Sequence, residues 1–201
     1  MSKILPNIDI EKSYENKING YICGIDEVGR GCLAGPVVAA AVILNFNEIP
    51  IGINDSKKLS KIKRKLINED LKIKAIDIAI GEATNIEIDE ANILNASLLA
   101  MKRAYENLTT PIKLALIDGI HSPQINCKTI NIIKGDSKSL SIAAASIIAK
   151  TYRDNFMEDI GKKYPKYNFK NNSGYGTKEH YQSIKLNGLT KYHRKSFKLF
   201  K

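Results

Sequence analysis

Residues 21–44 have the sequence YICGIDEVGRGCLAGPVVAAAVIL, in which two apolar runs flank a glycine-rich connection. Both runs contain few polar residues, as is typical of strands that are covered on both faces of a sheet. The first run ends in two neighbouring acids, Asp26 and Glu27, and Arg30 follows between two glycines. A surface pair of carboxylates needs no explanation, but a pair at the end of a core strand does. This stretch therefore predicts two paired strands and marks the first candidate site.

The chain that follows predicts a helix and then a strand. We expect a loop and a helix from about Ser60, with Leu59, Ile62 and Leu66 on its inner side. In residues 74–83, isoleucines alternate with smaller or polar residues, which indicates a strand.

Two longer helices are indicated by apolar residues at helical spacing. Asp89 and Glu90 open the first, since acids favour a first turn. Its apolar stripe consists of Leu94, Leu98, Met101, Tyr105 and Leu108. The second covers residues 139–160 and is expected to place Ile142, Ala145, Ala149, Tyr152 and Phe156 on one face. A last short helix is expected over residues 177–187, with Gly188 ending it.

Two further apolar segments, KLALIDG and KTINIIKGD, predict short buried strands that end in Asp118 and Asp136. Strands in hairpin order followed by alternating helix and strand indicate a mixed α/β sheet with helices packed on it. At 201 residues, the chain fits one domain, or one domain with an appendage.

The composition favours a polyanionic partner without requiring one. Lys and Arg number 31 against 21 Asp and Glu, giving a net charge of +10. The lysine excess could equally reflect biased codon usage. No apolar run approaches 18 residues, and the N-terminal stretch lacks a signal-peptide core, so we expect a cytoplasmic protein with no membrane association. Three cysteines in no metal-ligand spacing are expected to be reduced thiols.

Four acids share one context, because Asp26, Glu27, Asp118 and Asp136 each end or directly follow an apolar strand. If the strands are neighbours, the acids converge, and two carboxylates about 4 Å apart repel by roughly 4 kcal/mol at an effective dielectric of 20. Protons or cations must then be shared, and hard divalent ions prefer carboxylate oxygens. A pair of such ions suits phosphodiester hydrolysis. The alternative is that these acids are turn formers and an ordinary exposed pair.

Adjacent strand residues point to opposite faces, so Asp26 and Glu27 cannot both face one ion on a regular strand. Gly29 and Gly31 favour an irregular strand end that would relieve this conflict.

Five motifs occur in order: GIDEVGRGCLAGPVVAAAVIL, NDSKKLS, LALIDG, IIKGDSKSLSIAAASIIAKTYRD and GYGTKEHYQSIKLNG…HRKSF. Together, from about residue 21 to 197, they resemble bacterial ribonuclease HII. The resemblance implies a ribonuclease H-like fold, a mixed five-stranded sheet flanked by helices, with a catalytic domain over residues 20–160. Residues 161–201 would form a C-terminal helical segment that contributes to substrate binding.

The resemblance also implies an activity. Members hydrolyse the RNA strand of RNA–DNA hybrids and nick DNA duplexes on the 5′ side of embedded ribonucleotides, giving 5′-phosphate and 3′-hydroxyl ends. They require Mg²⁺ or Mn²⁺. We expect a monomer acting on these nucleic acids.

By the resemblance, the catalytic metal ligands would be the four acids already singled out. Asp154 lies in a family-like motif too, but is expected to be a structural residue on a helix surface. The expected substrate-binding residues are Gly29, Arg30, Gly31, Ser56, Lys57, Lys58 and Tyr175. The glycine–arginine–glycine backbone would meet the ribonucleotide 2′-hydroxyl, and the Tyr175 ring would stack on the following deoxyribose.

The sequence departs from the family pattern at two places. Cys32 replaces a common proline, and Asn172-Ser173 replaces a frequent His-Lys pair, which puts substrate affinity in doubt more than the chemistry. Two rival functions share the fold: a catalytically silent nucleic-acid-binding module, and a nuclease that acts on DNA alone.

Overall fold

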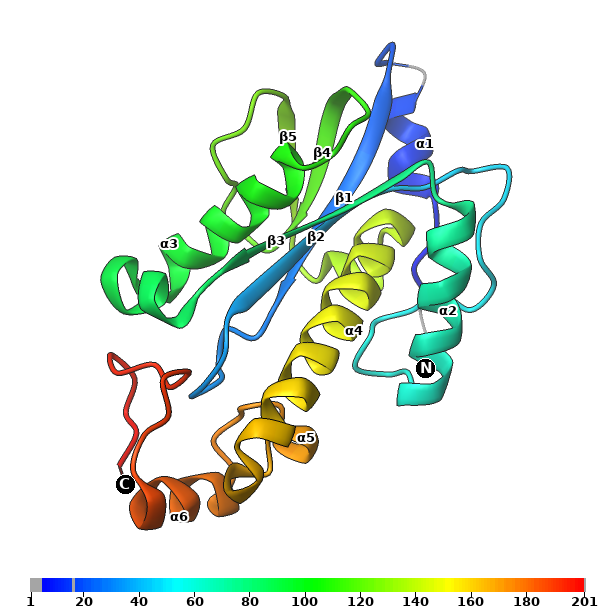
Figure 1. Cartoon of the computed structure of the whole chain (residues 1–201). Coiled ribbons are helices and arrows are strands. Elements are labelled where there is room, and N and C mark those ends of the chain that lie inside the picture. The colour runs from blue at the N-terminus through cyan, green and yellow to red at the C-terminus, as the bar shows by residue number, and fades with distance from the viewer. Residues whose placement is uncertain (1–4, 16, 201) are drawn as a thin grey trace.

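The computed structural model describes residues 5–15 and 17–200. Its strands are β1 (Tyr21–Val28), β2 (Val37–Ile43), β3 (Asp77–Ala83), β4 (Ile112–Asp118) and β5 (Lys128–Ile132). They form a sheet in the order β3-β2-β1-β4-β5 (Figure 1). The β1–β2 and β2–β3 pairs are antiparallel, whereas β1–β4 and β4–β5 are parallel. The mixed α/β sheet expected from the sequence is confirmed.

Helices cover both faces of this sheet. The α-helices are α1 (Asp9–Glu15), α2 (Lys61–Lys74), α3 (Asn85–Glu106), α4 (Leu140–Lys163), α5 (Phe169–Asn172) and α6 (Lys178–Asn187). Two 3-10 turns are η1 (Gly135–Ser137) and η2 (Pro165–Tyr167). Helix α3 lies on one face, and α4 with α2 lies on the other (Figure 1). Within the described residues, none of these helices combines the length and the apolar character needed to cross a membrane.

The β2 strand shows how the core forms, because its side chains alternate between two buried faces. Ala39 and Ala41 pack toward α3, whereas Val38 and Val42 pack toward α4 and α2. On the second face, α4 approaches β1 so closely that a Cβ at Gly24 would overlap the α4 backbone. The Ala-rich start of α4 is consequently buried all round over residues 141–149. This contact fixes α4 against the strand that carries the first two acids.

Two helices differ from the sequence-based expectation. Leu59 packs against the core as expected, but Ile62 and Leu66 are exposed, so the expected inner side is wrong for these two residues. The buried side of α2 consists of Ile67, Asn68 and Leu71. The physical reason is the position of α4, which covers the opposite side of α2 from those two residues.

Helix α3 begins earlier than expected. It starts at Asn85, where Thr84 and Glu87 form a capping box, and not at Asp89. A break at Asn92 (φ 69°) divides the helix, and the Asn92 side chain caps the second part. The expected start therefore falls just before this second part.

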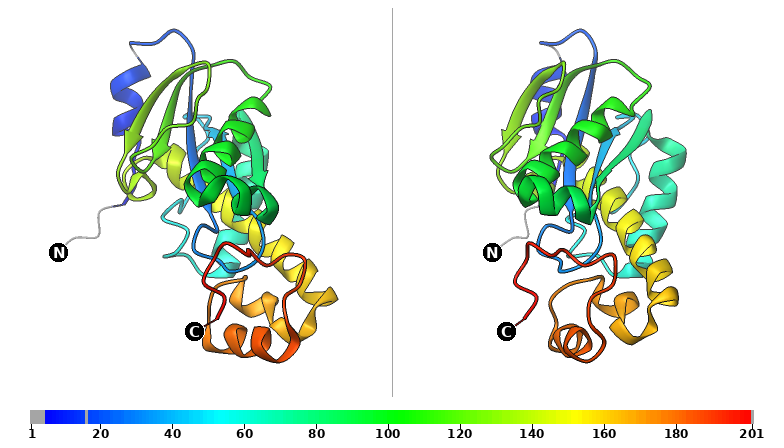
Figure 2. Two further views of the ribbon diagram at one scale, coloured as in Figure 1. Left: turned by 90° about the vertical axis from the view of Figure 1, so that its left-hand side faces the viewer. Right: turned by 60° about the vertical axis from the view of Figure 1, so that its left-hand side comes forward.

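The C-terminal segment packs below the sheet and returns to the β1–β2 connection (Figure 2). Its small core contains Tyr167, Phe169 and Ile184, which pack against Met157 on the last turns of α4. Isolated bridges join Cys32 to Tyr175 and Ala34 to His193. The described C-terminal residues thus contact the connection between β1 and β2, residues 29–36, which we call the glycine-rich loop and which lies next to the acids. The expected division near residue 160 falls in the last turn of α4 and stays a prediction.

Candidate active site

The fold brings the four acids together at one edge of the sheet. β1, β4 and β5 are parallel, so their carboxyl ends lie on the same side. Asp26 and Glu27 lie near the end of β1, Asp118 is the last residue of β4, and Asp136 lies in η1 just after β5. We call these four residues the acidic cluster. Asp26 and Asp136 are buried, and the other two acids are partly buried.

Within the acidic cluster, Asp26 and Glu27 point to opposite faces of the sheet. The pairing of β1 with β2 stays regular through Val28, so the expected irregular strand end is wrong. Asp26 pairs with Ala40, which belongs to the α4 face. Glu27 pairs with Ala39, which belongs to the α3 face.

Glu27 still interacts with the acid on the neighbouring strand. Pairing between β1 and β4 stops at Ile25 and Ile117, whereas β1 continues along β2 to Val28. The Glu27 side chain therefore has no β4 residue beside it. Besides burial, the charge of Asp118 raises the pKa of Glu27. The two acids of β1 thus flank the end of β4 from either face.

Burial and mutual repulsion disfavour the charged forms of these carboxyls. Burial raises the pKa of Asp26 well above its usual range, and the charges of the other three acids raise it further. Burial also raises the pKa of Glu27, although Arg30 opposes the shift through an ion pair of 3.1 Å. The pKa of Asp118 is raised chiefly by burial too, against a hydrogen bond of 2.6 Å from the Gly135 amide.

Little positive charge of the protein itself compensates the cluster. The Lys57 Nζ atom lies 3.4 Å from the Asp136 carboxylate, and the Lys57 side chain is otherwise mostly exposed. Burial works to lower the pKa of Lys57, but the charges of Asp136 and Asp26 outweigh it and raise the pKa. The Oε2 atom of Glu27 is buried and has no hydrogen-bond partner among the described residues. In the same part of the chain, no three acidic, histidine or cysteine side chains are arranged as a ready set of ligands to one ion.

The glycine-rich loop is held by two fully buried arginines that the sequence did not single out. Arg153 donates to the carbonyls of Ala34, Pro36 and Ser173. Gly29 has φ +94°, and a Cβ there would overlap the Arg153 guanidinium, so only glycine fits.

Arg194 completes the support of this loop. It donates to the carbonyls of Gly29, Arg30, Gly35 and Pro36. Nothing in the local sequence indicates these contacts, because the partner carbonyls lie 158 to 165 positions away.

Next to this loop, Tyr175 is 41% exposed, and an isolated bridge joins its backbone to Cys32. His180 Nδ1 lies 2.9 Å from the Tyr175 carbonyl, and His180 Nε2 lies 3.1 Å from Nε2 of His193. The ammonium of Lys150 lies 5.9 Å from the centre of the Tyr175 ring. His180 is completely buried.

The serine and lysines of the NDSKKLS motif have different surroundings. The Ser56 hydroxyl is buried and lies 2.9 Å from that of Ser146, which in turn lowers the pKa of Asp26 through a hydrogen bond. Lys57 faces Asp136, and the Lys58 ammonium pairs with Asp55 at 3.6 Å. The structure thus places only Lys57 of these three in direct contact with the acidic cluster.

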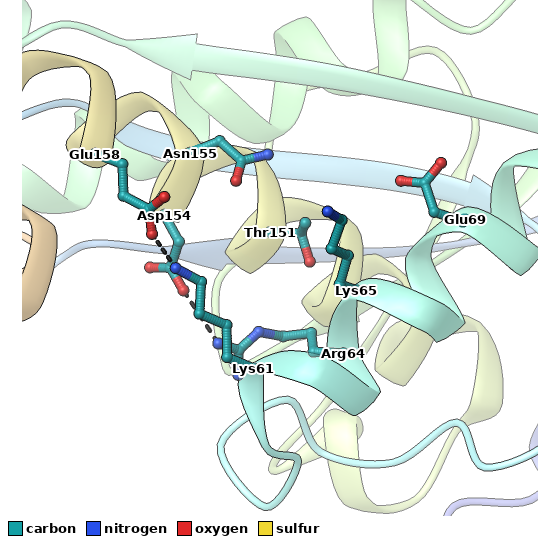
Figure 3. A pocket seen from close by; sticks show the side chains of 8 residues that line it. All are labelled: Lys61, Arg64, Lys65, Glu69, Thr151, Asp154, Asn155 and Glu158. Atoms are coloured by element: carbon teal, nitrogen blue, oxygen red, sulfur yellow. Dashed lines mark hydrogen bonds and ion pairs between the residues drawn. The ribbon is translucent and has the colours of Figure 1, made fainter.

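Asp154 is structural, as expected, but it is buried and does not lie on the helix surface. Its carboxylate accepts from Arg64 at 3.1 Å, Lys150 at 2.6 Å and Ser173 at 3.2 Å. It also borders a pocket of about 270 Å³ between α2 and α4, in which Lys61 pairs with Glu158 (Figure 3). Ion pairs between α2 and α4 neutralise the acids of this pocket. In the acidic cluster, by contrast, few cationic side chains neutralise the carboxylates.

A mixed five-stranded sheet with acids gathered at or just after the carboxyl ends of β1, β4 and β5 is typical of the ribonuclease H-like class of nucleases. A family model described as Ribonuclease HII matches residues 23–200. Ribonuclease HII of Wolbachia pipientis subsp. Culex pipiens (strain wPip) is 50% identical over 186 residues, which cover 92% of this chain and 94% of that protein. The chain belongs to the ribonuclease HII family and is a ribonuclease H-type endonuclease.

Solved structures agree on the fold. The PCNA:RNase HII complex from Archaeoglobus fulgidus gives a TM-score of 0.75 at 24% identity, covering 90% of this chain and 96% of that chain. Bst-RNase HIII in complex with Mn²⁺ gives a TM-score of 0.70 at 20% identity, covering 89% and 67%. The fold class implied by the sequence resemblance is confirmed.

Proposed function

We propose that this endonuclease hydrolyses the RNA strand of RNA–DNA hybrids and nicks DNA duplexes on the 5′ side of embedded ribonucleotides. The products would carry 5′-phosphate and 3′-hydroxyl ends. The observation that carries the proposal is the convergence of four carboxylates beside a loop whose backbone is fixed by buried arginines. Membership of the ribonuclease HII family supports it.

The acidic cluster fits hard divalent cations. Its donors are all carboxylate oxygens, which Mg²⁺ and Mn²⁺ prefer, and Glu27 presents a buried oxygen that has no hydrogen-bond partner in the described part of the chain. We infer that Asp26, Glu27, Asp118 and Asp136 hold Mg²⁺ or Mn²⁺ in a two-ion site. When bound, such ions supply Lewis-acid stabilisation of phosphate oxygens and a water of lowered pKa. The protein itself favours cation binding, because a bound cation relieves the repulsion among the acids.

The glycine-rich loop would recognise the ribonucleotide. Gly31 would allow a sugar to approach the backbone closely, since a Cβ there would meet no atom within 4 Å, whereas the space beside Gly29 is taken by Arg153. Backbone groups of Gly29, Arg30 and Gly31 would then contact the 2′-hydroxyl, the group that distinguishes RNA from DNA. The half-exposed Tyr175 ring would stack on the next deoxyribose and favour an RNA-to-DNA step.

Lysines near the acidic cluster would hold phosphates without reading base sequence. Lys57 would bridge Asp136 and a phosphate, since its side chain contacts Asp136 and is still 79% exposed. Lys58 would contact a phosphate of the nucleic-acid backbone further away from the acidic cluster. Ser56 would act through Ser146, because its own hydroxyl is buried. The enzyme would work as a monomer in the cytoplasm, where reduced cysteines persist.

The test is incubation with a labelled duplex that carries one ribonucleotide, beside an all-DNA duplex and an RNA–DNA hybrid, with and without Mg²⁺. We expect Mg²⁺-dependent cleavage 5′ of the ribonucleotide and none of the all-DNA duplex. Asp118→Asn should abolish cleavage while hybrid binding persists. Binding without cleavage by the wild type under any divalent metal would instead indicate a silent binding module. Cleavage of the all-DNA duplex would indicate a DNA nuclease.

A further inference from the structure

Glu11 has a carboxylate that is completely buried and, among the described residues, forms no ion pair. It lies on the short helix α1, outside the residues that the family model matches. The Oε1 atom accepts from the Ser139 hydroxyl at 2.6 Å and from the Ser141 amide at 2.9 Å. Glu11 Oε2 and the Ser141 hydroxyl have no hydrogen-bond partner among the described residues. A buried carboxylate is expensive to keep unless it stabilises something specific.

What Glu11 stabilises is the start of α4. Ser139 is the N-cap of this 24-residue helix, and its Oγ accepts from the Ile142 amide at 3.2 Å while it donates to Glu11. Helix amides at the N-terminus carry partial positive charge, which a carboxylate complements. Glu11 therefore provides a second cap, supplied by a segment far away in the sequence.

Backbone pairing beside Glu11 strengthens the same contact. The Asn7 amide donates to the Lys138 carbonyl at 3.2 Å, and the Leu140 amide donates to the Asn7 carbonyl at 3.0 Å. Residues 7–11 consequently hold residues 138–141 through both backbone and side chain.

The clamped segment continues directly into the acidic cluster. The Ser139 amide donates to the Gly135 carbonyl at 2.8 Å. The Gly135 amide in turn donates to Asp118 Oδ1 at 2.6 Å, and Asp136 is the next residue. A chain of contacts thus runs from Glu11 through Ser139 and Gly135 to two of the four acids.

We propose that Glu11 is a positioning residue for the acidic cluster: by fixing the start of α4 it holds η1, and with it Asp136 and the Gly135 amide that binds Asp118. The link to metal binding rests on the function proposed above. The placement of η1 itself depends only on the contacts from Glu11 to Gly135.

The experiment compares Glu11→Gln and Glu11→Ala with Glu15→Gln, which removes the same charge from an exposed position on the same helix. Mn²⁺ binding is measured by titration calorimetry, and exchange of the Gly135 amide by NMR without metal, at a temperature where circular dichroism shows each variant folded. Should Glu11→Ala fail to fold, Glu11→Gln and Ser139→Ala replace it. We expect Mn²⁺ affinity to fall about tenfold, as for other residues that orient metal ligands. Gly135 exchange should quicken by up to about tenfold, and Glu15→Gln should match the wild type.

Two results would overturn the inference. Glu11 variants that melt at lower temperature but bind Mn²⁺ like the wild type would show a role in stability alone. Unchanged exchange at Gly135 would show that η1 is held without Glu11. If the wild type itself bound no Mn²⁺, the proposed function would fail, and the exchange measurement would still decide whether Glu11 positions η1.

Discussion

The Nη2 atom of Arg194 lies 2.7 Å from the carbonyl oxygen of Gly29, a residue 165 positions earlier in the chain. The same buried guanidinium donates to the carbonyls of Arg30, Gly35 and Pro36. Burial lowers its pKa to about 10. Four carbonyl dipoles thus hold the cation, and the cation in return fixes the glycine-rich loop.

Replacing this guanidinium should loosen the loop and destabilise the protein. A lysine has three donors on a single nitrogen and cannot reach four carbonyls, so Arg194→Lys leaves buried carbonyls unpaired. We expect the free energy of unfolding to drop by about 2–4 kcal/mol in urea titrations. Arg103→Lys is the control, because Arg103 pairs with Glu87 near the surface and its change should be under about 1 kcal/mol. Equal losses in the two variants would contradict the role given to Arg194.

Removing one charge from the acidic cluster should stabilise the protein without metal. Asp26→Asn eliminates a buried carboxyl whose pKa is raised by burial and neighbouring acids. We expect the melting temperature in EDTA to rise by about 2–4 °C, the equivalent of about 1 kcal/mol, while cleavage is lost.

Asp154→Asn is the matched comparison for Asp26→Asn. Asp154 is also buried, but it pairs with Arg64 and Lys150, so its loss should lower the melting temperature. Replacing Asp by Asn should thus raise the melting temperature at one buried position and lower it at the other. A lower melting temperature for Asp26→Asn in EDTA would contradict the repulsion argued for the cluster.

Substrate choice should depend on the ring of Tyr175 and not on its hydroxyl. Tyr175→Phe keeps the stacking surface beside Lys150, whereas Tyr175→Ala removes it. Loss of one stacking contact is worth about 1–3 kcal/mol, or about five- to 150-fold in kcat/KM on the duplex with one ribonucleotide. Rates on continuous RNA–DNA hybrids should change less. Equal losses on both substrates would refute the stacking role.

The buried histidine pair should make the protein less stable in acid. His193 Nδ1 accepts from the Thr190 amide at 2.8 Å, so its Nε2 carries the proton and donates to His180. His180 can then donate from Nδ1 to the Tyr175 carbonyl. Both rings are neutral in this arrangement, and burial lowers the pKa of His193 to about 4.

The sign of the effect follows from proton uptake. The unfolded chain binds a proton near pH 6.5, whereas folded His193 binds it only near pH 4, so stability falls as pH drops between these values. The slope is at most about 1.4 kcal/mol per pH unit for this group. The raised carboxyl pKa values of the acidic cluster act in the opposite direction. The histidine contribution is isolated by comparing His193→Gln with His121→Gln, which is exposed; a wild-type slope in His193→Gln would contradict it.

Much of the fold and the acidic cluster could be predicted from the sequence, because both depend on local patterns. The apolar runs before Asp26, Asp118 and Asp136 predict the strands, and parallel strands bring their ends together. The TNIE stretch at Thr84 and Glu87 is a capping box that would have indicated the true start of α3.

Other features depend on contacts between distant segments. In α2, apolar residues occur on two sides, and only the position of α4 decides that Leu71 is buried and Leu66 exposed. Arg153 and Arg194 lie in the family-like TYRD and HRKSF stretches, but no local pattern indicates their partners, because backbone carbonyls of any residue type can bind a guanidinium. Glu11 is equally hidden, since its partners at Ser139 and Ser141 lie about 130 positions away.

The dependence of the glycine-rich loop on Arg194 has a consequence for biosynthesis. At about 5–20 residues added per second, a ribosome needs about 8–33 seconds to make the 165 residues that separate Gly29 from Arg194. During that interval the sheet can begin to form, but the emerging polypeptide lacks the Arg194 contacts that hold four carbonyls of the glycine-rich loop. Cleavage competence should therefore arise late in translation, and prematurely terminated fragments that lack Arg194 should be inert toward nucleic acid even where their strands have folded.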